Sequence, residues 1–157
     1  MERQFIRHGE TDGEVDGIAI GPHNFPLNKN GHIQAVHIRP KLLLEDGLDP
    51  TSMPIAVSER LRTWQTAKHI GSEIINNYAI LNPFTDLTPQ QRIEFRETGI
   101  LPDHVLEQGQ NLLDNFPQEQ IIVTHGLPIT AICKLLGVYQ EQRHPYPDFC
   151  EIRVVDI

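Results

Sequence analysis

The sequence alternates short apolar segments with longer amphipathic ones, and this alternation restricts the possible folds more than any other feature. We predict strands at residues 3–7, 54–57, 78–81, 120–124 and 149–156, and helices at 29–44, 60–76, 105–116 and 127–136. Strands that alternate with helices form parallel sheets, because a helical connection returns the chain to the same edge of the sheet. The last strand alternates apolar and polar residues, as a half-exposed edge strand does. The alternation therefore predicts an α/β sandwich with a mainly parallel sheet.

Local signals add detail to two of these helices. Asn28 is suited to cap the helix over 29–44, and Pro40 predicts a kink or a break within it. The spacing of apolar residues places Ile33 on the buried side of that helix. The same reasoning places Trp64 of the next helix in the core.

The composition is that of a globular protein with an excess of acidic residues. The chain has 157 residues, which suits one domain over 1–157, and 13 Lys and Arg against 21 Asp and Glu give a net charge of −8. This charge argues against binding to nucleic acid or to an anionic membrane. No apolar run is long enough to span a bilayer, and the N-terminal residues lack a signal-peptide core. Cys133 and Cys150 form no C-x-x-C motif, so we expect a cytoplasmic protein with reduced thiols.

Arg and His residues recur where the predicted strands end. They occur in the segments 7–11 (RHGET), 58–67 (SERLRTWQTA) and 124–126 (THG). Ligands of open parallel sheets bind beyond the carboxyl ends of the strands, so we expect the three segments to converge. Two histidines and at least two arginines would then form a cationic pocket, which suits a phosphate because the guanidinium fork matches phosphate oxygens. Gly9 and Gly126 allow the backbone to approach such an anion closely.

These segments resemble the motifs of the histidine phosphatase superfamily, also called the phosphoglycerate mutase-like family. The resemblance extends over nearly the whole chain, and the motifs follow one another in the family's order. The matching residues are FIRHGET at 5–11, Pro26-Leu27-Asn28 with Gly31 and Gln34-Ala35, the pattern of Ser58, Arg62, Thr66 and Ala67, and VTHG at 123–126. The resemblance implies a three-layer α/β sandwich with a mixed, mainly parallel central sheet.

The resemblance also implies a role for each residue of the pocket. His8 is the nucleophile and becomes phosphohistidine during the reaction. The residues implied to bind the phosphoryl group are Arg7, Arg62, His125, Gly126 and Thr11. Two guanidinium groups can neutralise the phosphoryl oxygens, so neither a metal nor a cofactor is required. Cationic neighbours lower the pKa of a histidine, which leaves its imidazole neutral and nucleophilic near pH 7.

An alkoxide leaving group needs a general acid, which in many relatives is a Glu in the loop after the third strand. Asp86 lies closest to that place, with Glu94, Glu97 and Glu10 as alternatives. Asp is also a common turn residue, so a structural role for Asp86 is equally open. Residues 86–89 (DLTP) resemble an ELTP stretch in the small phosphohistidine phosphatases of the SixA type, which cleave a P–N bond and need a strong acid less.

Two departures from the family pattern bear on the substrate. Glu14 stands where many relatives have a phosphate-binding Asn, so we expect a rearranged loop or a side chain that faces solvent. The stretch between Arg62 and His125 is short and leaves little room for the lid of true mutases. An open site favours a phosphatase that hydrolyses a phosphomonoester or phosphohistidine in a small molecule or a phosphoprotein. The alternatives are a phosphoglycerate mutase-like phosphotransferase and a non-catalytic relative that binds phosphorylated ligands.

The six other histidines match no metal-binding motif. His32 and His37 are five positions apart and so lie poorly on one helix face, and H-E-x-x-H or paired Cys/His patterns do not occur. We therefore predict no metal site. Arg60 is expected to be solvated or ion-paired, and Cys133, within an apolar helix, to be buried.

Overall fold

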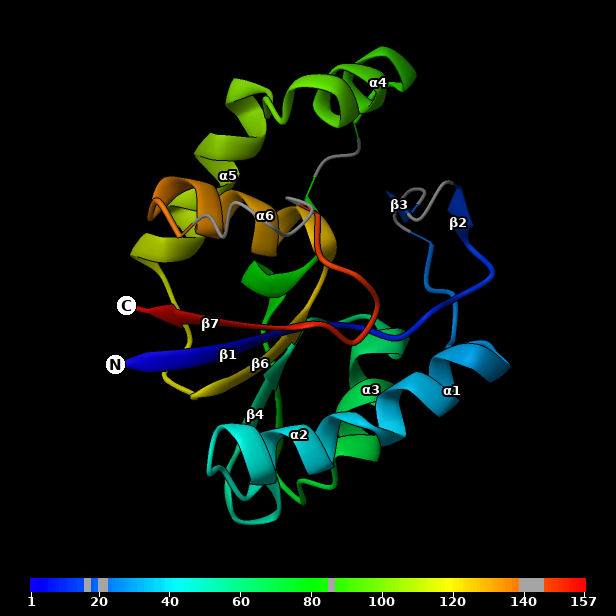
Figure 1. Ribbon diagram of the computed structural model, residues 1–157, viewed down its shortest axis with the longest axis vertical. Helices are drawn as coiled ribbons and strands as arrows, with labels where there is room; N and C mark the ends of the chain where they lie inside the picture. Colours follow the sequence, from blue (N-terminus) through cyan, green and yellow to red (C-terminus); the bar gives the residue numbers. More distant parts are fainter. Residues whose placement is uncertain (16–17, 20–22, 85–86, 139–145) are drawn as a thin grey trace.

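Among the described residues, five strands form one sheet with helices on both faces, as the computed structural model shows (Figure 1). The structure describes residues 1–15, 18–19, 23–84, 87–138 and 146–157, and only the backbone of 14–15 and 18–19. The strands of the sheet are β1 (Glu2–Arg7), β4 (Ile55–Val57), β5 (Ile75–Asn77), β6 (Ile121–Thr124) and β7 (Ile152–Asp156). The helices are α1 (Lys29–Val36), α2 (Ile38–Glu45), α3 (Leu61–Ile70), α4 (Pro89–Thr98), α5 (Asp103–Asp114) and α6 (Gly126–Leu135), with 3-10 turns η1 (Pro50–Ser52) and η2 (Ala79–Leu81).

The strand directions confirm the predicted fold class. The sheet has the order β5-β4-β6-β1-β7, and all neighbouring pairs are parallel except β1 and β7. β7 runs antiparallel along one edge, where the sequence predicts a half-exposed strand. A separate hairpin pairs β2 (Glu14–Val15) with β3 (Ile18–Ala19). The result is a three-layer α/β sandwich with a mixed, mainly parallel sheet.

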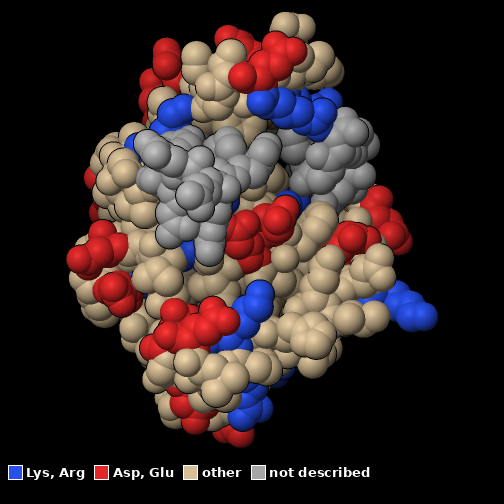
Figure 2. Space-filling model, in the orientation of Figure 1, with Lys and Arg blue, Asp and Glu red and all other residues tan. Residues whose placement is uncertain are grey.

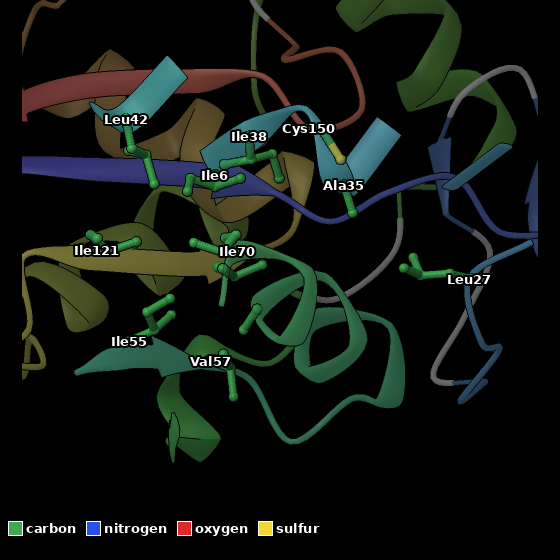
Figure 3. Packing of buried hydrophobic residues seen from close by; sticks show 12 residues of the cluster. Ile6, Leu27, Ala35, Ile38, Leu42, Ile55, Val57, Ile70, Ile121 and Cys150 are labelled. Atoms are coloured by element: carbon green, nitrogen blue, oxygen red, sulfur yellow. The ribbon is translucent and has the colours of Figure 1, made fainter. Parts of the chain in front are cut away.

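Alternate residues of the central strands supply two cores, one on each face. In β1, Ile6 packs into the core beneath α1, α2 and α3, whereas Phe5 packs into the core beneath α5 and α6. Figure 3 shows the first of these cores, where Ile38 and Leu42 of α2 lie near Ile6. Because neighbouring strand residues point to opposite faces, a helix layer on each side buries the whole strand.

The helix predicted over 29–44 is divided into α1 and α2. Pro40 lies in the first turn of α2, where the missing N–H is tolerated, and the break occurs at His37 rather than at the proline itself. A proline ring clashes with the carbonyl four residues earlier, here that of Val36, which is where α1 ends. Ile33 is 54% exposed, so its predicted burial is wrong. Asn28 caps α1 as predicted, since its side chain accepts a hydrogen bond from the Gly31 amide.

The helix predicted over 60–76 ends early. Gly71 adopts a left-handed conformation with φ of 97° and terminates α3, so β5 begins at Ile75 and the strand predicted over 78–81 is wrong. Trp64 is 40% exposed and lies against the Lys68 ammonium, so its predicted place in the core is also wrong. The face that α3 buries consists of Arg62, Thr63, Thr66, Ala67 and Ile70, which leaves Trp64 outside it.

The parallel strands end at a common edge of the sheet. Arg7 pairs with Thr124 in register, and Val57 pairs with Val123. The residues that follow these strands therefore leave the sheet side by side, which fixes the place of the candidate site. Within the described part of the chain, no helix combines the length and apolar character needed to cross a membrane.

Candidate active site

Three strand ends bring the predicted cationic residues together. Arg7 is the last residue of β1, Arg62 lies in the first turn of α3, and His125 directly follows β6. Arg7 and Arg62 are each 2% exposed, His8 is 0% exposed and His125 is 3% exposed. The ring centroids of His8 and His125 are 5.1 Å apart. The four residues that the sequence singles out thus share one buried cluster.

Two hydrogen bonds fix the orientation of the His8 imidazole. Its Nδ1 lies 2.7 Å from the carbonyl oxygen of Gly9, an acceptor, so this nitrogen carries the ring proton. Its Nε2 accepts a hydrogen bond from Nε of Arg62 over 3.2 Å. The Nε2 lone pair of a neutral His8 therefore faces the Arg62 guanidinium.

A chain of hydroxyl groups orients His125 in the same way. Its Nδ1 lies 3.4 Å from a terminal nitrogen of Arg62, and its Nε2 lies 2.9 Å from Oγ of Ser58. The Thr63 hydroxyl donates its proton to the Arg60 carbonyl over 2.7 Å, so its oxygen is free to accept a hydrogen bond from the Ser58 hydroxyl. The Ser58 oxygen then accepts a hydrogen bond from the N–H at Nε2 of His125. Every member of the chain then has a partner when His125 is neutral.

Burial and positive charge keep both imidazoles neutral. Burial is the largest cause that lowers the pKa of His8 well below its ordinary value, and Arg62 and Arg7 lower it further. Burial likewise lowers the pKa of His125 most, followed by His8 and Arg62, and the charge of Arg60 contributes as well. Arg60, which the sequence assigns to solvent or an ion pair, thus adds to the field of the cluster.

This burial predicts that the protein loses stability in mild acid. Below the ordinary histidine pKa of about 6.5, the unfolded chain binds protons that buried His8 and His125 do not. We expect each histidine to lower the free energy of unfolding by up to about 1.4 kcal/mol for every unit that the pH falls below that value. Urea unfolding between about pH 5 and pH 8 measures this slope. The dependence of the unfolding free energy on pH should become shallower in His8→Gln. An equally steep dependence in that variant would show that burial of a neutral His8 does not cause it.

Arg7 is held by a segment that sequence analysis did not single out. Its terminal nitrogen donates to the Pro147 carbonyl over 2.9 Å. Its guanidinium carbon lies 3.9 Å from the ring centroid of Phe149 and 4.8 Å from that of Tyr146. Two aromatic faces and a carbonyl therefore fix the plane of the guanidinium. The sequence offers only a weak signal for this role, two aromatic residues ahead of the last strand.

Gly126 allows one of these rings to approach. A Cβ atom at this position would overlap the Tyr146 ring, and Gly126 is also the first residue of α6. Its small size therefore serves the packing of Tyr146, in addition to the phosphate contact that the resemblance implies.

We expect Gly126→Ala to disturb Arg7 through Tyr146. Overpacking at such a contact costs about 1–3 kcal/mol, and displacement of the ring loosens the guanidinium, which raises KM for a phosphate ester. Thermal unfolding and steady-state kinetics measure the two effects. The double variant Gly126→Ala/Tyr146→Leu should regain stability relative to Gly126→Ala, because the smaller side chain makes room. Purely additive effects would contradict the contact.

Helices α1 and α3 both pack against the segment that follows His8. The Gly9 amide donates to Oγ1 of Thr66 in α3 over 3.1 Å, and a Cβ atom at Gly9 would lie 2.6 Å from the carbonyl oxygen of Gly31 in α1. A side chain at Gly31 would in turn overlap the Glu10 carbonyl. Close approach of two backbones, which only glycine permits, fixes the loop after His8 between the two helices.

The structure describes three of the four candidate general acids. Asp86 lies outside the described residues. Glu94 and Glu97 are exposed on α4. The carboxylate of Glu10 accepts hydrogen bonds from the side chain of Asn28 over 2.7 Å and of Asn30 over 3.4 Å, so it faces the start of α1.

Two further residues of the loop after His8 enter the sequence analysis. Thr11 is buried, pairs with Leu27 in an isolated bridge, and accepts a hydrogen bond from the Gly13 amide over 3.3 Å. Its role in phosphate binding stays a prediction. Glu14 belongs to β2, and its side chain lies outside the described residues.

The cations of the cluster do not extend into a basic surface on the face that Figure 2 shows. Acidic side chains are spread over the upper, left and lower parts of this face, with basic side chains between them. A net charge of −8 fits this distribution. The buried arginines thus form a local positive site within an acidic protein, which selects a small anion over a polyanion.

Solved structures share this fold over nearly the full chain. The TTHB049 protein of Thermus thermophilus is 23% identical with a TM-score of 0.70, and the match covers 99% of this chain and 93% of that chain. The phosphoglycerate mutase of the same organism gives 23% identity, a TM-score of 0.71 and the same coverage. The Rv3214 protein of Mycobacterium tuberculosis gives 22% identity and a TM-score of 0.66, covering 99% of this chain and 91% of that one. These similarities establish the fold. No curated protein matches the chain significantly.

A family model supplies the link to function. The model of the histidine phosphatase superfamily (branch 1) matches residues 4–86, slightly more than half of the chain. The matched segment contains Arg7, His8 and Arg62, whereas His125 lies beyond it. This match favours a phosphatase or a mutase-like activity. By fold and by sequence, the chain belongs to the histidine phosphatase superfamily.

Proposed function

We propose that the protein is a phosphatase that hydrolyses a phosphomonoester or a phosphohistidine through a phosphohistidine intermediate on His8. The observation that carries this proposal is the arrangement of His8 and Arg62. A neutral imidazole presents its Nε2 lone pair to a guanidinium that also reaches His125. A nucleophile and the charge that stabilises its reaction with phosphate therefore lie within one hydrogen bond of each other.

In the first step, Nε2 of His8 attacks phosphorus in line with the leaving group. A bound phosphate draws the Arg62 guanidinium onto its oxygens, which releases the Nε2 lone pair for attack. The new N–P bond forms as the P–O or P–N bond of the substrate breaks, and Arg7 and Arg62 neutralise the equatorial oxygens. The N–H at Nδ1 stays hydrogen-bonded to the Gly9 carbonyl, and this hydrogen bond stabilises the positive charge that develops on the ring.

In the second step, water attacks the phosphohistidine in line with His8. The N–P bond breaks, inorganic phosphate forms and neutral His8 is restored, while the proton lost by the water passes to the carboxylate that protonated the leaving group and so restores the acid. The same arginines hold the phosphoryl oxygens throughout, so both steps use one set of charges. This scheme assigns charge neutralisation to guanidinium groups and calls for no metal ion.

We propose Asp86 as the acid that protonates an alkoxide leaving group. Asp86→Asn should slow hydrolysis of an alkyl phosphate by about 10²-fold or more, because that leaving group needs a proton. Hydrolysis of p-nitrophenyl phosphate should slow much less, since p-nitrophenolate leaves without one. Initial rates with both substrates measure the contrast, and Glu94→Gln and Glu97→Gln serve as exposed controls. Equal slowing of both substrates would count against Asp86.

The short stretch between Arg62 and His125 supports the proposed class of substrate. It leaves little room for a lid, and a site without a lid suits a phosphoryl group on a small molecule or a protein. The test is turnover of p-nitrophenyl phosphate in EDTA, with glycerol as a competing acceptor. We expect EDTA-resistant release of inorganic phosphate as the main product. Predominant glycerol phosphate would favour the mutase-like phosphotransferase, and phosphate binding without turnover would favour the non-catalytic relative.

A further inference from the structure

Two histidines outside the cluster contact each other between helices. His32 lies on α1 and His69 near the end of α3, and both are half-buried. Nδ1 of His32 is 2.8 Å from Nε2 of His69, and the rings meet edge to face with centroids 5.1 Å apart. One ring nitrogen donates its proton to the lone pair of the other. The N–H of one nitrogen and the lone pair of the other therefore point at each other across the gap between α1 and α3.

The spacing of the two nitrogens is close to that of two ligands on one metal ion. Imidazole nitrogens lie about 2.0–2.1 Å from Zn²⁺, so two of them on one tetrahedral ion are about 3.3 Å apart. On a square-planar ion, cis nitrogens are closer, at about 2.9 Å. Starting from 2.8 Å, the nitrogens need to separate by half an ångström or less, and each ring must also turn so that its lone pair leaves the N–N line and points at an ion beside it. The ring that donates now would carry its proton on its other nitrogen, which leaves both facing lone pairs free.

We propose that His32 and His69 form a binding site for a divalent transition-metal ion of borderline softness, namely Zn²⁺, Ni²⁺ or Cu²⁺, which bridges α1 and α3. Imidazole selects these ions, whereas Mg²⁺ and Ca²⁺ need oxygen ligands that the pair does not supply. Among the described residues, no group of three or more His, Cys, Asp or Glu side chains gathers, so the pair supplies two ligands and water completes the coordination.

Both histidines are partly exposed to solvent. The half-buried position leaves solvent access for the ion and its water ligands.

A metal ion here would link α1 and α3, the two helices that contact Gly9 and Glu10 directly after His8. Gly31, the neighbour of His32, packs against Glu10, and Thr66, one turn before His69, holds the Gly9 amide. The bridge would therefore stabilise this part of the fold, while the proposed phosphoryl transfer continues without it. The site does not depend on the proposed function, since it shares no ligand with His8 or His125.

Thermal unfolding with and without metal tests the site. At ten times the dissociation constant, ZnCl₂ or NiCl₂ should raise Tm by about 3–6 °C, and MgCl₂ should leave it unchanged. His32→Gln and His69→Gln should each abolish the rise. His37→Gln, which removes an exposed histidine at the end of α1, should retain it in full.

Electron paramagnetic resonance of the wild-type protein with one equivalent of CuSO₄ keeps the test independent of how the variants fold. Coupling of Cu²⁺ to two imidazole nitrogens supports the site, and its loss in His69→Gln assigns the ligands. No rise in Tm and no nitrogen coupling in the wild type would overturn the proposal. So would an equal rise in Tm in the wild type and in both variants, since exposed histidines would then be binding the ion.

Discussion

Replacing His8 with alanine is expected to lower the rate of p-nitrophenyl phosphate hydrolysis by about 10⁴-fold or more. The reason is that the imidazole forms the covalent bond to phosphorus, and no described neighbour offers a second nucleophile in the same position. His125 has its Nε2 turned toward Ser58 and its Nδ1 toward Arg62. Initial rates in EDTA measure the loss, and circular dichroism checks that the variant is folded.

Three controls separate loss of the nucleophile from damage to the site. His8→Gln keeps a polar group near Arg62 and should be as inactive as His8→Ala, because an amide does not attack phosphorus. Added imidazole should restore part of the activity of His8→Ala, since it can occupy the space of the missing ring. His37→Ala should keep full activity, because His37 is exposed at the end of α1. Turnover of His8→Gln within tenfold of the wild type would contradict the role of His8.

Replacing Arg62 with glutamine is expected to lower kcat/KM by about 10²–10³-fold, the usual effect of removing one charge-stabilising donor. Arg62 contacts His8 and His125 and donates to the His23 carbonyl over 2.9 Å, so its position is fixed from three sides. Arg62→Lys keeps the charge and loses the planar fork, so we expect a defect of about the same order.

The pH profile distinguishes this role from general disruption. Arg62 is one of the charges that lower the pKa of His8, so Arg62→Gln should move the acid limb of kcat/KM to higher pH. Arg39→Gln removes an equal charge from an exposed place on α2 and should change neither rate nor profile. An Arg62→Gln enzyme with less than a tenfold defect would show that this guanidinium does not act on the phosphoryl group, and an unshifted acid limb would show that its charge does not lower the pKa of His8.

The sequence predicts the sheet better than the helices around it. β1 and β6 are buried on both faces, so their apolar runs stand out from the segments beside them. Helix ends depend on single residues instead. Gly71 ends α3 through its left-handed conformation, and a clash of Pro40 with the Val36 carbonyl ends α1. Trp64 satisfies the apolar periodicity of a helix and is nevertheless exposed, because the face that α3 buries includes polar residues such as Arg62, Thr63 and Thr66.

The residues of the candidate site that end or follow the parallel strands can be predicted from the sequence. Arg7, Arg62 and His125 converge because parallel strands end at one edge, which the order of strands and helices already implies. The aromatic rings that hold Arg7 and the contact between His32 and His69 could not be predicted in this way. They join segments that are far apart in the sequence, and no short motif marks either contact.

The stereochemical course at phosphorus tests the phosphohistidine mechanism most directly. A phosphate ester made chiral at phosphorus with sulfur and oxygen isotopes can be hydrolysed in isotopically labelled water and the configuration of the product determined. Each in-line displacement inverts phosphorus, so two successive displacements through His8 predict net retention of configuration. Net inversion would mean that water attacks the substrate in a single step, and it would contradict the role of His8 as nucleophile.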